Sequence, residues 1–231
     1  MRLLRAFIVF LLGSFCAYGQ NLSKDFTSIV NKIDSTDEIS IGVKINVYSN
    51  KGGSKIYSTS SSIEFSKKGA ITHLGEMEYY KSKEYEVHID HDEKQVLIQK
   101  LSKVNNQFSD LNLGEIKKYL KEEEDAVTKK KPIISMTSNS NGIKTYSMTN
   151  VEGYEEIIIE LDMKEIKINK IIYEYSKTGS LKGQYCVLDY SKFDFKPAFS
   201  QGYFDKSKYF TVSNNQIKLV SKYNSYNLIT E

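Results

Sequence analysis

The chain has 231 residues, of which 40% are hydrophobic and 26% are charged, and its formal net charge is +3. Lysines and acidic residues are interleaved along it, which excludes the dense basic block that nucleic-acid binding requires. Tryptophan is absent and only three histidines are present, which argues against a sugar-stacking glycosidase and leaves few ways to build a histidine-dependent triad.

The first 19 residues have the pattern of a secretory signal peptide. Two arginines precede an apolar run at 6–12, and the small-x-small sequence at 17–19 predicts cleavage after Gly19. The apolar run is far shorter than the roughly 20 residues that cross a bilayer. We therefore expect an exported protein, periplasmic or secreted, in which residues 20–231 form a single domain.

An amphipathic helix is predicted over 21–34, followed by a change to strand periodicity. The apolar residues of the helix recur at helical spacing on one stripe: Leu22, Phe26, Ile29, Val30 and Ile33. From Ile39 to Val47 every second residue is apolar, which predicts a half-buried strand. Glycines in the turn at 50–53 return the chain into a second strand at 55–66. The helix stripe must pack on these or later strands.

The next segments predict a strand at 71–80, with a bulge at Gly75, and then a hairpin within 79–101. In the hairpin, Tyr85, Val87 and Ile89 alternate with polar residues, and a polar turn at 90–94 leads into a second strand. The apolar side of this hairpin must face either another part of the protein or a ligand.

The second half repeats this order of elements. A helix is predicted over 112–127, and Asn141-Gly142 marks a hairpin between strands at 133–137 and 143–150. Further strands are expected at 155–161, 165–175 and 181–190, then an extended aromatic run at 192–199 and a tail with weaker alternation. These elements predict a mainly β (α+β) fold, a curled antiparallel sheet or incomplete β-barrel closed by a few helices.

Few residues have the pattern of a chemical site. The only ligand-rich cluster lies in the hairpin: His88, Asp90, His91, Asp92 and Glu93. These side chains could converge on a metal ion, but a solvated turn is the simpler interpretation, so we expect no metal and no other cofactor. Neither a Gly-x-Ser-x-Gly sequence nor a glycine-rich phosphate loop is present. We expect no catalytic residue, and we interpret Cys186 as a buried structural thiol.

Aromatic residues are abundant, with 17 tyrosines and 11 phenylalanines. One explanation is that aromatic side chains suit strands and their edges. The other is that a curled sheet lined with apolar side chains holds an apolar ligand. Composition does not distinguish between the two.

The order of signal peptide, amphipathic helix and long meander, with the hairpin EYEVHIDHDEKQVLIQKL at 84–101, resembles the LolA-like periplasmic lipoprotein carriers. It is also similar to secreted proteins of Bacteroidetes type. The resemblance implies a half-open barrel whose apolar cavity accepts acyl chains, with 112–127 as a lid. It implies these cavity-face residues: Ile41, Val43, Ile45, Ile63, Phe65, Tyr85, Val87 and Ile89. The sheet arginine with which these carriers hold the lid has no counterpart, because no arginine follows residue 5.

We therefore expect a non-enzymatic protein that binds or carries a lipid or a lipidated protein in an apolar half-barrel cavity. Its partners would be acyl chains or a lipoprotein, with transient contact to a membrane surface and no contact to nucleic acid. The alternative is an envelope structural or interaction module whose β core is filled by its own side chains.

Overall fold

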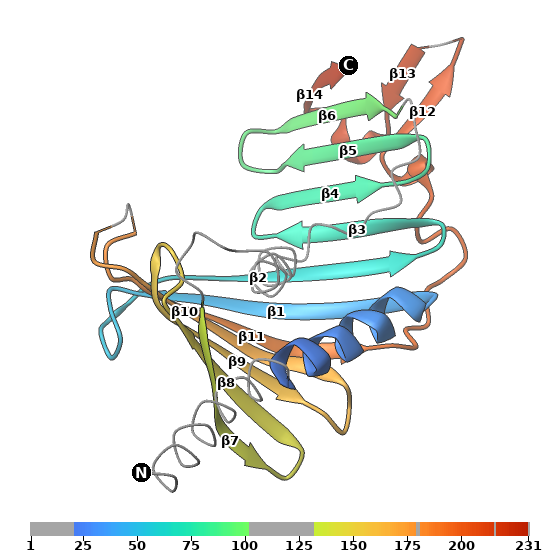
Figure 1. Cartoon of the computed structure of the whole chain (residues 1–231). Coiled ribbons are helices and arrows are strands. Elements are labelled where there is room, and N and C mark those ends of the chain that lie inside the picture. Colours follow the sequence, from blue (N-terminus) through green and yellow to red (C-terminus); the bar gives the residue numbers. More distant parts are fainter. Residues whose placement is uncertain (1–20, 102–131, 179–180, 215, 231) are drawn as a thin grey trace, which may run out of the picture. The chain divides into compact units, whose positions relative to one another are not determined.

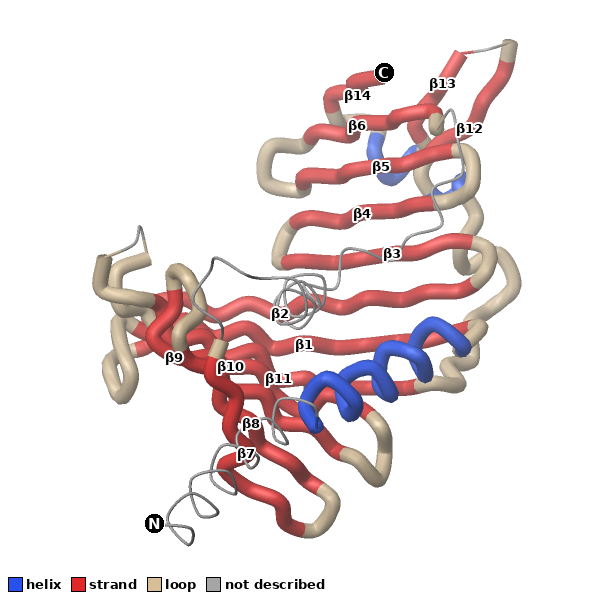
Figure 2. Tube along the Cα trace, in the orientation of Figure 1, coloured by secondary structure: helices blue, strands red, loops and turns tan. Residues whose placement is uncertain are grey.

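The computed structural model describes residues 21–101, 132–178, 181–214 and 216–230 (Figure 1). The described chain is mainly β, with one α-helix at 21–35. Twelve strands follow one another in the hydrogen-bonded order β14-β6-β5-β4-β3-β2-β1-β11-β10-β9-β8-β7, so the described part of the sheet is not closed into a barrel. Strands β12 and β13 form a separate hairpin. The mainly antiparallel β class predicted from the sequence is confirmed (Figure 2).

The strands have the following bounds: β1 Glu38–Tyr48, β2 Lys55–Ser66, β3 Gly69–Leu74, β4 Met77–Lys81, β5 Tyr85–Asp90, β6 Gln95–Lys100, β7 Ile133–Ser140, β8 Ile143–Thr149, β9 Tyr154–Asp162, β10 Lys167–Tyr175, β11 Tyr185–Asp194, β12 Phe210–Ser213, β13 Gln216–Leu219 and β14 Asn227–Thr230. Two short 3-10 helices, η1 Lys206–Lys208 and η2 Ser221–Tyr223, lie in the C-terminal segment. In the described residues no helix is both long and apolar enough to cross a membrane.

The contacts divide the chain into two compact units. The described residues of the first unit are 21–35, 44–58, 132–178 and 181–190. Those of the second are 36–43, 59–101, 191–214 and 216–230. Strands β1, β2 and β11 each contribute residues to both units.

In the first unit, the helix at 21–35 packs on one face of the sheet. Cross-strand pairing places Tyr146, Ile159, Ile171 and Leu188 in one row on one face, and all four are buried. The five apolar residues of the helix stripe are also buried, between 0 and 7% exposed. The helix meets this face at Asp25, which binds Tyr146. The prediction of an amphipathic helix packed on strands is therefore confirmed.

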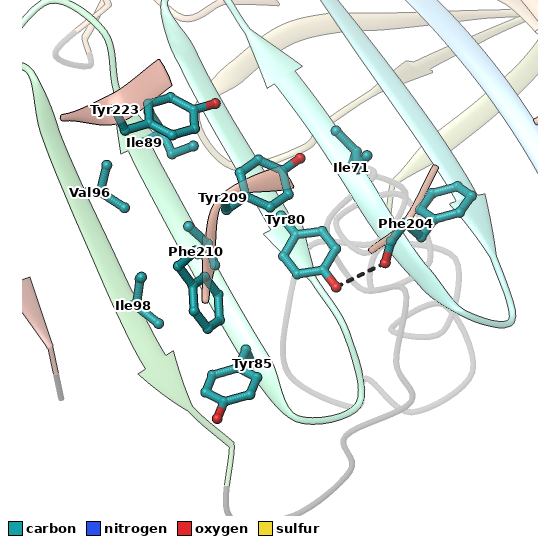
Figure 3. Close-up of a cluster of buried hydrophobic side chains, with 11 residues drawn as sticks. Ile71, Tyr80, Tyr85, Ile89, Val96, Ile98, Phe204, Tyr209, Phe210 and Tyr223 are labelled. Carbon is teal, nitrogen blue, oxygen red and sulfur yellow. Dashed lines mark hydrogen bonds between the residues drawn. The ribbon is translucent and has the colours of Figure 1, made fainter. Parts of the chain in front are cut away.

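In the second unit, the apolar face of the β5–β6 hairpin is covered by the C-terminal segment of the same chain. Figure 3 shows side chains of β3–β6 packed against four aromatic residues of that segment: Phe204, Tyr209, Phe210 and Tyr223. The Tyr80 hydroxyl donates a hydrogen bond to the Phe204 carbonyl at 3.0 Å. The rings of Tyr85 and Phe210 meet edge to face with centroids 5.0 Å apart. This part of the core is filled by protein side chains.

Two predicted elements need correction. The single strand expected at 71–80 is a hairpin, β3–β4, because Gly75 adopts a left-handed φ of +56° and reverses the chain between Leu74 and Met77. The tail also contains β14, which pairs in parallel with β6 and was not predicted. The predicted helix at 112–127 lies outside the described residues.

Candidate functional site

The meander β2–β6 has a second face, opposite the one that the C-terminal segment covers. Residues paired across antiparallel strands point to the same face, and the register Ile63–Thr72–Tyr79–His88–Leu97 runs along this second face. Six apolar side chains on it form what we call the apolar patch: Ile63, Phe65, Leu74, Met77, Tyr79 and Leu97. Ile63 is buried, Leu74 is 41% exposed, and the other four are half-buried.

A polar border adjoins the apolar patch along β4 and β5. Glu86 lies between two bases, with Oε1 at 2.8 Å from His88 Nε2 and Oε2 at 3.7 Å from Lys81 Nζ. Because a carboxylate only accepts hydrogen bonds, Nε2 of His88 carries the proton in this pair. The His88 ring also meets Tyr79 of the patch edge to face, with centroids 4.9 Å apart. The surface therefore combines apolar side chains with polar groups held in place by their contacts.

The register divides the predicted cavity-face residues between two faces of the second unit. Ile63 and Phe65 lie on the apolar patch. Tyr85, Val87 and Ile89 lie on the opposite face, where they are at most 7% exposed beneath the C-terminal segment. These three are core residues of the second unit and line no open surface.

The remaining predicted residues belong to β1. Ile41 and Val43 are buried in the second unit, whereas Ile45 is half-buried in the first. Alternation within one strand predicted their burial, but it carries no information about which face of a neighbouring strand they join.

Four residues of the apolar patch were not singled out from the sequence: Leu74, Met77, Tyr79 and Leu97. The sequence feature that could have identified Leu74 and Met77 is the β3–β4 turn. If Gly75 is recognised as a turn residue, Leu74 lies opposite Met77. The same step puts Tyr79 opposite His88, on the side of the hairpin that the sequence presents as polar.

A second polar cluster holds the helix at 21–35 in the first unit. Asp25 Oδ2 accepts hydrogen bonds from Lys144 Nζ at 2.7 Å and from the Tyr146 hydroxyl at 2.6 Å. Burial, and then the hydrogen bond to Asp25, raises the pKa of Tyr146 well above the ordinary tyrosine value. The hydroxyl therefore stays protonated and remains a donor. Lys32 of the same helix donates to the Glu165 carbonyl.

The predicted ligand-rich cluster does not converge in the structure. No three His, Cys, Asp or Glu side chains come together within the described part of the chain. His91 Nδ1 lies 2.9 Å from the Tyr226 hydroxyl, and its Nε2 lies 3.6 Å from Glu78, away from His88 and its partner Glu86. Cys186 is buried, and burial raises the pKa of its thiol, which disfavours the reactive thiolate.

No protein-family description matches the sequence, and no curated protein is similar to it. An uncharacterised conserved protein from Thermus thermophilus is similar in structure, with a TM-score of 0.49 and 4% identity over 91% of this chain and 99% of that one. A DUF1329 family protein from Desulfovibrio piger gives a TM-score of 0.34 and 14% identity over 80% and 97% of the two chains. A domain named as an outer membrane lipoprotein-sorting protein, from Vibrio parahaemolyticus, gives 0.32 and 9% over 80% and 97%.

Proposed function

We propose that the protein is exported to the periplasm and binds the acyl chain of a lipid or lipidated protein on the apolar patch, without catalysing a reaction. The observation that supports this is the contrast between the two faces of β2–β6. One face is filled by the C-terminal segment. The other carries the apolar patch, whose side chains come from β2, β3, β4 and β6, beside the polar border on β4 and β5.

Burial of an acyl chain supplies the apolar part of the binding free energy. Each methylene group removed from water contributes about 0.8 kcal/mol. Covering about eight methylene groups therefore contributes about 6 kcal/mol, before the entropic cost of association is subtracted. The flexible thioether side chain of Met77 gives the surface the adaptability that chains of different length require.

The test compares two variants of similar chemistry. Met77→Gln and Leu97→Gln, combined, place amide groups in the apolar patch, while Ile56→Gln changes an exposed apolar residue of the first unit, 54% exposed. Displacement of a fluorescent fatty acid measures binding, and circular dichroism confirms folding. We expect the patch variant to bind at least fivefold more weakly and the Ile56 variant to bind normally. Equal binding by both variants would contradict the proposal. A lipid-free mass for protein purified from cells, together with no probe binding, would contradict it as well.

A second candidate function is a non-catalytic envelope interaction module. The observation that favours it is the filled face of the hairpin, where Tyr85, Val87 and Ile89 contact the protein's own C-terminal segment. In that case the patch would contact another envelope protein, and the patch variant would lose that partner in a cross-linking experiment while no lipid binds to either form.

A further inference from the structure

The two ends of the β2–β6 meander carry opposite charge. In a meander, alternate turns lie at the same end, so the β2–β3 and β4–β5 turns share one end and the β3–β4 and β5–β6 turns share the other (Figure 1). The first end holds five lysines and two glutamates: Lys67, Lys68, Lys81, Lys83, Lys100, Glu84 and Glu86. The second holds four acidic residues and one lysine: Glu76, Asp90, Asp92, Glu93 and Lys94.

The basic end adjoins the apolar patch directly. Phe65 of the patch pairs with Ala70, and Ala70 pairs with Lys81, so the ammonium group and the aromatic ring share one face and one row. The Lys81 side chain is 35% exposed and its contact to Glu86 is 3.7 Å long. A partly exposed pair of this length contributes little free energy, so the ammonium group has donors to offer a ligand. Lys68 and Lys83 are exposed in the adjacent turns.

A hollow of about 490 Å³ opens at the same end of the meander. Three lysines and two acidic residues line it: Lys67, Lys68, Lys196, Asp37 and Glu38. Ser66, Phe195 and Pro197 complete the lining. Lys67 is paired with Asp37 at 2.7 Å. Of the lysines at the basic end, Lys67 and Lys68 line this hollow, whereas Ser66 places it on the face opposite Phe65.

We infer that the ligand of the apolar patch is an amphiphile with an anionic head group, a carboxylate or a phosphate, and that the head lies at the basic end beside Lys81, Lys68 and Lys83. This inference rests on the function proposed above. The acyl chain then runs from the level of Phe65 towards Leu74 and Met77, four residues along the strands, or about 13 Å at 3.3 Å per residue. The acidic end repels an anionic head, so the reverse orientation is disfavoured.

The experiment uses probes with the same twelve-carbon chain and different head groups. Dodecanoate and a dodecanoyl lysophosphatidylglycerol are anionic, dodecanoylglycerol is neutral, and dodecyltrimethylammonium is cationic. Each competes with a fluorescent fatty acid for the full chain. The test variant combines Lys68→Gln, Lys81→Gln and Lys83→Gln, and the control variant combines Lys177→Gln, Lys182→Gln and Lys218→Gln. The control has the same net charge and changes exposed lysines elsewhere.

We expect the anionic probes to compete best and the cationic probe least. The test variant should bind the anionic probes about five- to tenfold more weakly and the neutral probe normally, while the control keeps the wild-type order. A preference for dodecanoate over the lysophospholipid, or the reverse, distinguishes a carboxylate from a phosphate as the source of the charge. If the neutral probe competes as well as the anionic probes, or if the test variant binds the anionic probes as tightly as the wild type, the head-group inference is wrong. The proposal that the patch binds an acyl chain is then unaffected. If no probe binds, both the acyl-chain proposal and the head-group inference are wrong.

Discussion

The Tyr209 hydroxyl donates a hydrogen bond of 2.8 Å to Oε1 of Glu78, and both residues are buried. Glu78 belongs to β4 and Tyr209 follows η1, so this bond fastens the C-terminal segment to the meander. A buried carboxylate that loses a donor retains the full cost of its desolvation. The bond is therefore a sensitive point for the stability of the second unit.

Tyr209→Phe should lower the free energy of unfolding by about 1–3 kcal/mol, because it leaves one oxygen of Glu78 without its donor. Urea denaturation followed by tyrosine fluorescence measures the change. Tyr57→Phe, at a residue 56% exposed, is the matched control and should alter stability by less than about 0.5 kcal/mol. Equal stability of the Tyr209 variant and the wild type would show that the bond contributes nothing net.

Alkaline pH should unfold the protein cooperatively. Burial, and next the Glu78 carboxylate, raise the pKa of Tyr209, and burial is also the main cause of the raised pKa of Tyr80 and Tyr190. In the unfolded chain these hydroxyls ionise near pH 10, while in the folded chain they stay protonated. The contribution of these hydroxyl groups to the free energy of unfolding is therefore fully present below about pH 10, and it is lost as the pH rises above that value. Circular dichroism that is unchanged at a pH where all tyrosines are ionised would contradict this.

Asp25→Ala should destabilise the packing of the helix at 21–35 by about 1–3 kcal/mol, since it removes the acceptor shared by Lys144 and Tyr146. Combining it with Tyr146→Phe gives a double-mutant cycle. We expect the double variant to be less destabilised than the sum of the single variants, because both remove the same hydrogen bond. Strict additivity of the two changes would mean that the bond does not couple the helix to β8.

Gly75→Ala should cost about 1 kcal/mol, because residue 75 has a φ of +56° that residues with a Cβ adopt unfavourably. The added Cβ would also lie 3.3 Å from Thr59 Oγ1. Thermal unfolding of this variant beside Glu76→Ala, at the next residue of the same turn, separates the backbone effect from a general effect of changing the turn. Two variants of equal stability would contradict the assigned conformation.

The sequence was sufficient for features that depend on local periodicity. The stripe from Leu22 to Ile33 predicted the helix and its buried side, and the alternation at Tyr85, Val87 and Ile89 predicted their burial. Glycine turns at Gly52 and Gly142 marked hairpins because their positive φ is a local property of the residue. Each of these patterns can be recognised within a segment of about a dozen residues or fewer.

The phase between strands could not be predicted in the same way. Ile63 and Val87 both sit on alternating apolar positions, yet they point to opposite faces because the intervening turns at Gly69, Gly75 and Ser82 set the register. A turn longer or shorter by one residue would reverse the faces. The apolar patch therefore emerged only from the three-dimensional pairing.

The segment that covers the apolar face of the β5–β6 hairpin could not be predicted from the sequence either. Phe204, Tyr209 and Tyr223 cover it from a tail whose aromatic residues follow no regular period, since the segment is built of turns and short 3-10 helices. Contacts of this kind depend on tertiary packing, which local pattern does not encode.

The docking of this segment also has a kinetic consequence. The bonds Tyr80–Phe204 and Glu78–Tyr209 join residues 124 and 131 positions apart. Contacts over such separations close slowly because the intervening chain must lose its conformational freedom first. Until they form, the meander β2–β6 presents an uncovered sheet face of tyrosine, valine and isoleucine. A chain in which these contacts have not yet formed therefore exposes more apolar sheet surface than the native protein, and is more prone to aggregate.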